Sequence, residues 1–336
     1  MGSAHWTDGS EPSVDLDLEA AAEIIRKRGI RRIGLQLPEG LKRISEKVAE
    51  KIADMTGSEV IISGDPCYGA CDIDLVLCEE VDLLIHIGHA GMLGGGPLLD
   101  KVIYIEAQIR SDLRPAVEKA IPLLKTKRVG VATTVQHVHR IGEALEVLKE
   151  HGILGVLGEP GQRTKYRGQV LGCDYSAARS LDVTEHIFVG TGQFHPLGMA
   201  LATGKRVVAA DPVACQVSVI DPEPMLRRRY AAIARAAGAR KIAVLVTKKP
   251  GQKRMELARK MVEIGALDNR EMYLVYLDCV VPDILINLGA EAAVSTACPR
   301  VALDDAPIFS IPLLTPSEFE ILLGKRKDYQ MDEIVD

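Results

Sequence analysis

Aromatic residues are scarce in this sequence. Only 4% of its 336 residues are Phe, Trp or Tyr, and the single tryptophan is Trp6. A core with so few rings must be built from aliphatic side chains, and aliphatic runs are typical of helices packed on a buried parallel sheet. The scarcity also argues against a binder of single-stranded nucleic acid, which needs aromatic stacking platforms.

An excess of positive charge is lacking as well. The chain has 46 acidic and 41 basic residues, for a net charge of −5. A protein that coats nucleic acid needs a basic footprint, so we expect no direct nucleic-acid partner. The longest apolar stretch, residues 81–99, is interrupted by Asp82, His86 and His89. A membrane span needs about 20 mostly apolar residues, so we expect no membrane association.

The seven cysteines are odd in number and widely spaced. Residues 1–20 are rich in acidic side chains and contain no apolar segment of the kind found in signal peptides. We therefore expect a cytoplasmic protein without a disulfide framework. In a reducing compartment the cysteines serve as core residues, ligands or nucleophiles.

Three segments begin with a basic residue and continue as an apolar run, at 32–35, 128–131 and 241–244. A helical pattern follows each of them, at 41–55, 139–151 and 254–264. Three further apolar runs follow in each case: 59–63, 83–87 and 102–105; 170–171, 187–189 and 207–210; 274–277, 292–295 and 308–311.

This alternation of strands and helices indicates βαβ units with parallel sheets. We predict an α/β fold of three related parallel-sheet domains, with boundaries 1–112, 113–220 and 221–336. The first domain has an additional helix at about 16–28, capped by Asp15 or Asp17 and ended by Gly29. Ligands of such sheets bind beyond the carboxyl ends of the strands, so the loops there are the places to search.

Three cysteines share one setting in three different repeats. Cys71, Cys173 and Cys298 each come after an apolar strand and a small residue. We place Cys71 and Cys173 after second strands and Cys298 after a third strand. If the domains face a common centre, three thiolates there suit an iron–sulfur cluster with one open iron, or zinc with an open position. The alternative is three unrelated buried cysteines.

The remaining cysteines have other interpretations. Cys78, Cys215 and Cys279 lie in apolar surroundings and are expected in the core, where cysteine is often found. Cys67 competes with Cys71, but no third cysteine completes a short cluster motif, since Cys78 follows only after six residues. We favour Cys71 because Gly69 and Ala70 let the backbone approach a cluster. The role of Cys67 stays unassigned.

Several motifs together resemble the diphthamide synthase family. They occur in order through all three repeats: QLPEGL at 36–41, GDPCYGAC at 64–71, HIGH at 86–89, GQVLGC at 168–173, and TACPR at 296–300 with Asp304 and Asp305. The resemblance covers the chain from about residue 15. It implies three related α/β domains around a central [4Fe-4S] cluster, each giving it one cysteine. By position these are Cys71, Cys173 and Cys298.

The resemblance further implies S-adenosylmethionine near the open iron. The reaction is transfer of its 3-amino-3-carboxypropyl group to C2 of a histidine imidazole in translation elongation factor 2. A homodimer and an external electron donor are implied with it. Residues of the strand-end loops are our candidates for holding S-adenosylmethionine: Gln36, Pro38, Glu39, Gly69, His89, Gln193, His195 and Asp304.

Three alternative functions remain open on the sequence. A quinolinate-synthase-like hydro-lyase is similar in plan, but its open iron acts as a Lewis acid on a small substrate. A non-enzymatic iron–sulfur electron-transfer subunit would need no S-adenosylmethionine pocket. A zinc enzyme would bind no iron.

The chain lacks the short three-cysteine loop of conventional radical enzymes that use S-adenosylmethionine, so we expect Cγ–S cleavage by radical chemistry, with methylthioadenosine rather than 5′-deoxyadenosine as product.

Overall fold

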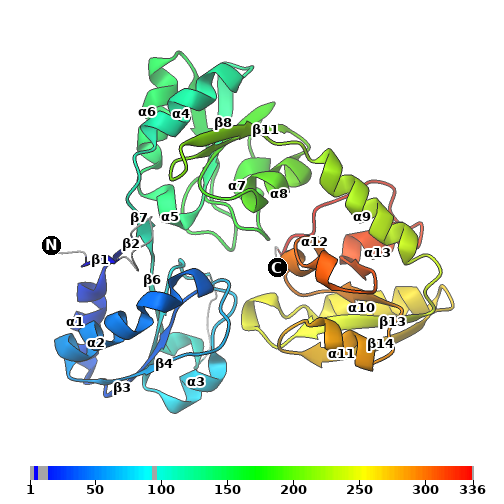
Figure 1. Cartoon of the computed structure of the whole chain (residues 1–336), viewed down its shortest axis with the longest axis horizontal. Coiled ribbons are helices and arrows are strands. Elements are labelled where there is room, and N and C mark those ends of the chain that lie inside the picture. Colours follow the sequence, from blue (N-terminus) through cyan, green and yellow to red (C-terminus); the bar gives the residue numbers. More distant parts are fainter. Residues whose placement is uncertain (1–3, 7–13, 93–96, 335–336) are drawn as a thin grey trace. The chain divides into compact units, whose positions relative to one another are not determined.

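The computed structural model describes residues 4–6, 14–92 and 97–334 (Figure 1). The chain divides into two compact units. Unit 1 contains residues up to 171 together with 176–193 and 206–219, and unit 2 contains 172–175, 194–205 and the chain from 220 onward. The chain therefore crosses between the units several times. The predicted boundaries of three domains stay a prediction.

Three separate parallel sheets form the framework of the two units. The first is β4-β3-β5-β6 (Glu59–Ile62, Arg32–Gln36, Leu83–Ile87 and Val102–Ile105). The second is β12-β11-β10-β8-β9 (Gln216–Val219, Arg206–Asp211, Glu185–Val189, Arg128–Thr133 and Leu154–Leu157). The third, in unit 2, is β14-β13-β15-β16 (Glu271–Leu277, Lys241–Thr247, Ala292–Ser295 and Leu313–Leu314).

The three sheets share one strand order. In each, the first strand in the chain lies between the second and the third, and the fourth lies outside the third. All pairings are parallel except that of β12, which lies antiparallel on β11. The first strands are β3, β8 and β13, which are the three segments that open with a basic residue. The α/β class with repeated parallel sheets is confirmed.

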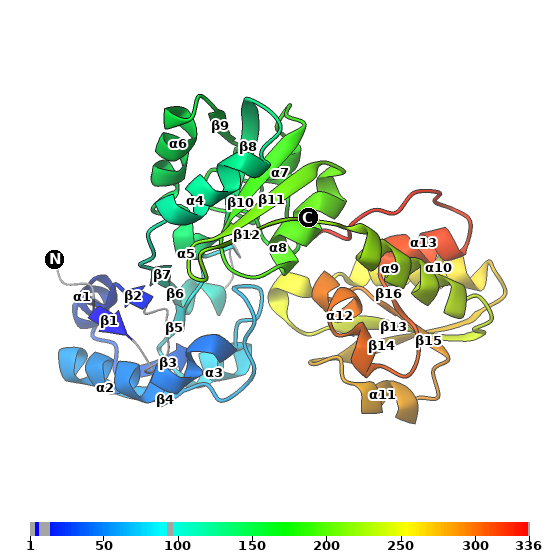
Figure 2. The ribbon, with the colours of Figure 1, turned by 45° about the horizontal axis from the view of Figure 1, so that its top comes forward.

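Helices cover these sheets on both faces. Those of unit 1 are α1 to α7 (Leu18–Arg28, Ser45–Thr56, Leu75–Glu80, Arg114–Ala120, Val135–Val138, Ile141–Glu150 and Ser176–Arg179). In the first sheet, α1 and α2 pack on one face through Ile25 and Val48, and α3 packs on the other through Cys78 (Figure 2). In the second, α4 and α6 pack together on one face. The predicted first helix is confirmed, with Asp17 as its N-cap and Gly29 as its C-cap.

Unit 2 repeats this layering. Its helices are α8 to α13 (Phe194–Thr203, Glu223–Arg235, Met255–Ala266, Pro282–Asn287, Pro299–Leu303 and Pro316–Leu322). The third sheet packs against α9, α10 and α13 on one face and against α11 and α12 on the other (Figure 1). Short 3₁₀ helices complete the two units at Glu39–Ile44, Leu99–Lys101, Ile121–Leu123, Pro250–Gln252 and Ala306–Ile308.

Two of the predicted strands were wrong. The second strand of the middle repeat is Leu154–Leu157, and 170–171 is not a strand. The neighbouring Gln169 forms an isolated bridge with Thr133. The last strand is Leu313–Leu314 rather than 308–311, because a 3₁₀ turn that contains Pro307 occupies Ala306–Ile308 and the strand starts only after Pro312.

A small antiparallel sheet of β1, β2 and β7 (Ala4–Trp6, Val14–Leu16 and Gln108–Ile109) was not predicted. Its strands have two or three residues each, too few to show a period in the sequence. Within the described residues, no helix has the length and apolar character that a membrane span requires.

Candidate functional site

Gln36 and His86 mark the carboxyl edge of the first sheet. Gln36 ends β3, His86 lies in β5, and the two residues are register partners. The strand that follows β3 in the chain, β4, pairs on one side of it, and the next strand, β5, pairs on the other side. Ligands of doubly wound sheets bind at such a switch point. Both side chains are nevertheless buried, so they orient neighbouring groups rather than contact a ligand directly.

The Gln36 amide is oriented by two backbone groups of the loop that carries Cys71. Its Nε2 donates to the carbonyl oxygen of Asp72 at 2.8 Å, and its Oε1 accepts from the Asp74 amide at 3.4 Å. Oε1 therefore faces Nδ1 of His86, 2.9 Å away, and that nitrogen must be the donor. Since neutral imidazole has one N–H, Nε2 of His86 is an acceptor.

The same sequence of donors and acceptors continues to His89. Nδ1 of His89 lies 2.9 Å from Nε2 of His86 and so donates to it. Burial, and then the neighbouring His89, holds the pKa of His86 well below its usual value, and burial lowers the pKa of His89 to about 4. Both rings are therefore neutral at pH 7. The relay from Gln36 through His86 leaves Nε2 of His89 as a lone-pair acceptor.

The loop bearing Cys71 is shaped by glycine and tied down by lysine. A Cβ on Gly69 would stand 3.1 Å from the Cys71 sulfur, so glycine leaves room for that thiol. The Asp72 amide closes a turn on the carbonyl oxygen of Gly69 at 3.0 Å. Lys42, in the 3₁₀ helix Glu39–Ile44 that follows β3, donates to the carbonyl oxygens of Gly64 and Asp65. Gly69 therefore makes space for the Cys71 thiol and does not itself offer a side chain for binding.

Cys67 lies in the same loop but differs in setting. Its side chain is fully buried, whereas that of Cys71 is partly exposed. The Cys67 carbonyl oxygen accepts from the Glu39 amide at 3.2 Å, which joins the loop to the segment after β3. This setting supports the preference for Cys71 as the ligand and indicates a packing role for Cys67.

Two further candidates of unit 1, Glu39 and Pro38, lie beside this loop, and a third, Gln193, lies elsewhere in the unit. Glu39 is exposed, and its carboxylate is paired with Lys42 at 2.6 Å, which lowers the pKa of Glu39. Pro38 packs against Gly88, whose φ of +101° and close approach, 2.9 Å from a built Cβ to the proline ring, require glycine. Gln193 is exposed in the loop after β10.

Cys298 comes three positions after the end of β15 and is the N-cap residue of α12, which agrees with its predicted place after a third strand. Its amide donates to Oε1 of Gln252 at 3.2 Å. The Asp304 carboxylate accepts from Nε of Arg300 at 2.8 Å, and the Arg300 guanidinium lies 4.5 Å from the centre of the Phe194 ring. Asp304 is thus joined to Phe194 through Arg300.

His195 and Tyr175 lie in the same unit. Burial, and then the nearby Arg300, lowers the pKa of His195 to about 4, so its imidazole is neutral at pH 7. Burial raises the pKa of Tyr175 well above its usual value, and the charges of Cys173, Glu333 and Cys298 add to that effect. Tyr175 therefore lies within electrostatic reach of Cys173 and Cys298, the two candidate ligands of unit 2.

The predicted setting of Cys173 needs a correction. It does not follow a second strand directly, because β9 ends at Leu157 and a long connection leads from there to Cys173. The connection is held at the carboxyl end of β8, where the Thr133 amide donates to Gly168 and the Val170 amide donates to Thr133. Cys71 likewise comes nine positions after the end of β4. Long loops, rather than strand ends, carry these two thiols.

The expected core cysteines are only partly as predicted. Cys78 is buried on α3, and burial raises its pKa to about 11. Cys215 and Cys279 are only partly buried. Cys215 lies in the turn between β11 and β12 with a φ of +50°, and Cys279 comes just after β14. Turn geometry places them outside the core.

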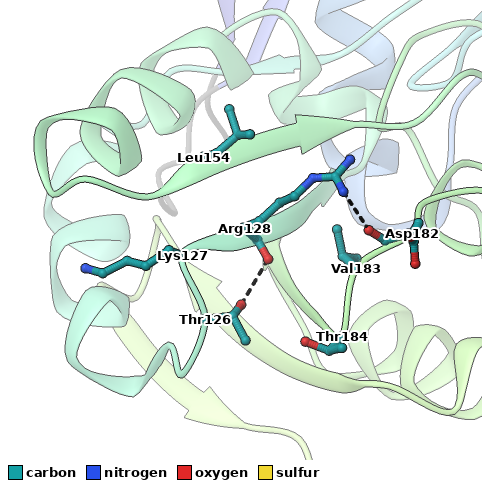
Figure 3. Close-up of a pocket in the computed structure, with 7 residues that line it drawn as sticks. All are labelled: Thr126, Lys127, Arg128, Leu154, Asp182, Val183 and Thr184. Carbon is teal, nitrogen blue, oxygen red and sulfur yellow. Dashed lines mark hydrogen bonds between the residues drawn. The ribbon is translucent and has the colours of Figure 1, made fainter.

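A surface cavity of about 420 Å³ is lined by Lys127, Arg128 and Asp182, among others (Figure 3). It opens at the amino ends of β8, β9 and β10, because Arg128 and Leu154 are the first residues of their strands. Arg128 donates to the backbone oxygen of Asp182 at 3.0 Å there. This is the wrong edge of the sheet for the predicted site, and none of the candidate residues lines the cavity.

The chemistry of the donors fits an iron–sulfur cluster. All seven cysteines of the described chain are thiols, and thiolates are the ligands of such clusters. Within the residues that the structure describes, no three Cys, His, Asp or Glu side chains are arranged as a metal site. Cys71 belongs to unit 1, whereas Cys173 and Cys298 belong to unit 2. That one cluster binds all three stays a prediction.

The fold defines a protein of repeated doubly wound α/β sheets, with most of the candidate residues in or beside the loops that follow its strands. Comparison with known proteins specifies the family. The family model for diphthamide synthesis proteins matches residues 37–334, and the chain belongs to this family.

Individual relatives agree with that assignment. The chain is 40% identical over 318 residues to a 2-(3-amino-3-carboxypropyl)histidine synthase of Pyrococcus horikoshii, covering 93% of this chain and 91% of the relative. It is 29% identical to the protein of the same name from Methanocaldococcus jannaschii, covering 90% and 87%. The crystal structure of Dph2 from Pyrococcus horikoshii with a 4Fe-4S cluster superposes with a TM-score of 0.89 at 37% identity, covering 95% of this chain and 94% of that one.

Proposed function

We propose that this chain catalyses the first step of diphthamide biosynthesis. It transfers the 3-amino-3-carboxypropyl group of S-adenosylmethionine to C2 of a histidine imidazole in translation elongation factor 2. The observation that carries the proposal is the 40% identity to the Pyrococcus synthase over nearly the whole length of both chains. The solved structure of similar fold that holds a 4Fe-4S cluster supports the cofactor.

The proposed cluster ligands are Cys71, Cys173 and Cys298. When bound and reduced, a cluster with one open iron supplies an electron to the sulfonium, which breaks the Cγ–S bond and releases methylthioadenosine. The hydrogen that the three-carbon group replaces on imidazole C2 leaves as a proton. Loss of this proton would leave one surplus electron on the substituted ring. If that electron returns to the cluster, the overall transfer is redox-neutral, and an external donor is needed only to bring the cluster to its reduced state.

The task of the protein is to aim Cγ, rather than C5′, at the open iron. We place Nε2 of His89 among the groups that orient S-adenosylmethionine, because the relay from Gln36 presents it as an acceptor. The exposed Glu39 carboxylate and Gln193 amide offer further polar groups, with Pro38 and Gly69 shaping the loop. In unit 2, neutral His195 and the Arg300–Asp304 pair are the corresponding candidates.

The protein substrate is elongation factor 2, and the compartment is the cytoplasm. We also propose that the chain acts as a homodimer. Sedimentation at micromolar concentration is expected to give twice the 36.4 kDa chain mass, and a monomer alone at that concentration contradicts the homodimer.

The test is anaerobic reconstitution with iron and sulfide, followed by spectroscopy, metal analysis and turnover with elongation factor 2. We expect four irons per chain and S-adenosylmethionine-dependent addition of mass to the factor at one histidine. Bound zinc without iron indicates a zinc enzyme instead. A cluster without S-adenosylmethionine binding indicates an electron-transfer subunit or a hydro-lyase.

A further inference from the structure

We propose that the C-terminal segment 332–334 is a strap that positions Cys173 and Cys298 relative to each other, with Arg254 as its anchor. The inference concerns only these two cysteines, which belong to unit 2. It rests on the proposed function, since it assigns the strap to cluster ligation. After α13 the chain (red in Figure 2) arches away from that helix before its last described residues.

The Arg254 guanidinium is hydrogen-bonded to the loop residues that directly precede Cys298 in the sequence. Its Nε donates to the carbonyl oxygen of Thr296 at 2.7 Å, and its Nη2 donates to that of Ala297 at 3.1 Å. Two residues earlier, Gln252 accepts from the amide of Cys298 itself at 3.2 Å. Three consecutive residues that end at the thiol are therefore fixed through their backbone.

The same guanidinium holds the strap. Nη1 and Nη2 donate to the two carboxylate oxygens of Asp332 at 2.9 and 2.6 Å, and Nη1 also donates to the carbonyl oxygen of Glu333 at 3.3 Å. Together with the bonds to Thr296 and Ala297, all five N–H groups of arginine are used. The side chains of Arg254 and Asp332 are only 6% and 8% exposed, so the pair is buried and bidentate.

The other end of the strap reaches the Cys173 loop. The Ile334 amide donates to the carbonyl oxygen of Cys173 at 2.8 Å. The Glu333 carboxylate accepts from the amide of Tyr175, two residues further on, also at 2.8 Å. Ile334 is 3% exposed, which keeps this end of the chain packed.

These bonds form a continuous connection from the backbone of Thr296 and Ala297, directly before Cys298, through Arg254 and the strap to the backbone of Cys173. A buried ion pair is weak evidence for stability, since desolvation offsets its attraction, but its geometry is directional. A bidentate pair of planar groups specifies distance and angle in a way that a lysine could not. That is what two ligands of one rigid cluster require of their loops. Arg254, Asp332 and Ile334 are thus positioning residues.

The sharpest test removes the hydrogen bond between the strap and Cys173. Ile334→Pro deletes the backbone N–H that donates to the carbonyl oxygen of Cys173. Ile334→Ala shortens the side chain but keeps that N–H. After anaerobic reconstitution, without S-adenosylmethionine, we measure the rate of iron loss to a chelator and the electron paramagnetic resonance spectrum of the reduced cluster. We expect about tenfold faster loss for Ile334→Pro, the size expected for one buried hydrogen bond, and an altered spectrum. Ile334→Ala should stay within about twofold of wild type.

The anchor is tested by Asp332→Asn, which retains the shape of the side chain and removes its charge. Its matched control is Glu320→Gln, which breaks the partly exposed pair with Arg326 in the same unit. We expect faster iron loss and a changed midpoint potential for Asp332→Asn and neither for Glu320→Gln. Asp332→Glu, which restores the charge, should recover part of the wild-type iron retention.

The outcomes separate the two proposals. If wild-type protein binds no [4Fe-4S] cluster, the proposed function is wrong. If wild type binds the cluster and Ile334→Pro and Asp332→Asn retain iron, spectrum and potential like their controls, the strap alone is wrong. Should Asp332→Asn fail to fold, the Ile334 pair still decides, because both substitutions lie near the end of the chain and only the proline removes the N–H that donates to Cys173.

Discussion

Nε2 of His86 lies 2.9 Å from Nδ1 of His89, and this contact fixes which nitrogen of His89 is an acceptor. Both imidazoles are held neutral by burial. The pair connects the packing of the first sheet to the chemistry at its edge. Protonating either buried ring lowers the free energy of unfolding, and this loss can be measured.

The first prediction concerns pH. The pKa of His89 is lowered from 6.5 to about 4 in the folded protein, so the unfolded chain binds its proton more tightly between those values. Stability is therefore fully present above about pH 6.5 and is lost as the pH falls toward 4, by up to about 3 kcal/mol for this residue. Urea unfolding between pH 7 and pH 4.5 measures the loss.

His89→Asn is the comparison for that measurement. The pKa values of His86, His137, His139 and His195 are also lowered, so the wild-type slope contains their contributions. The variant removes one of these protons, and its free energy of unfolding should fall less steeply over the same range. Equal slopes for the two proteins contradict a neutral His89.

The second prediction concerns the cysteines. Cys71→Ala, Cys173→Ala and Cys298→Ala should each abolish binding of an intact cluster, because thiolate ligands have no substitute in alanine. Cys215→Ala and Cys279→Ala should keep it, since neither lies in the three ligand loops. Iron content and the visible spectrum after reconstitution give the result. An intact cluster in Cys298→Ala overturns the ligand assignment.

The third prediction concerns glycine at position 88. Its φ of +101° is unfavourable for other residues, and a Cβ there would stand 2.9 Å from Pro38. Gly88→Ala should lower the free energy of unfolding by about 1–3 kcal/mol. Gly40→Ala, where a Cβ meets nothing within 4 Å, is the matched control and should change it little. Similar losses in both variants argue against strain at Gly88.

The fourth prediction separates a structural ion pair from the strap. Arg229 and Glu318 are almost fully buried and joined by two bonds, Nε to Oε1 at 2.7 Å and Nη2 to Oε2 at 2.6 Å. Arg229→Met leaves a carboxylate buried without its partner and should cost about 3–5 kcal/mol of stability. Cluster content per folded chain should not change. A selective loss of iron in this variant means that the pair also serves the cluster.

The sequence predicts the framework well because buried parallel strands leave a local signature. Strands β3, β8 and β13 each begin with a basic residue at the surface and continue into the core. β9 escapes the same search, because Leu154–Leu157 is short and contains a glycine. The apolar pair 170–171 competes with it, and only the hydrogen bonding of the sheet decides between them.

The site is less predictable, since its parts meet only in space. His86 and His89 are visible as candidates, but the acceptor role of His89 depends on Gln36, which lies 50 positions before His86. Asp332 lies in a polar stretch near the end of the chain, 78 positions from Arg254, and gives no motif. Residue types predict chemistry here, whereas the direction of each hydrogen bond requires the folded structure.

The last prediction concerns which bond of S-adenosylmethionine breaks. Conventional radical enzymes hold their cluster with one short cysteine loop and release 5′-deoxyadenosine. In this chain Cys71, Cys173 and Cys298 lie in three loops far apart in sequence, carried by different sheet repeats. Such a scaffold has no reason to present the sulfonium in the same orientation, and orientation alone selects the carbon that faces the iron.

With Cγ facing the iron, the adenosine product is methylthioadenosine, and the transferred fragment keeps its amino and carboxylate groups. Chromatography of a reduced, anaerobic reaction with elongation factor 2 should show methylthioadenosine in a one-to-one ratio to modified histidine. Cys298→Ala, which should lack the cluster, should form neither product and serves as the control. Accumulation of 5′-deoxyadenosine in step with modification of the factor would mean that C5′ faces the iron, because C5′–S cleavage releases methionine and the 5′-deoxyadenosyl fragment, whereas Cγ–S cleavage releases methylthioadenosine.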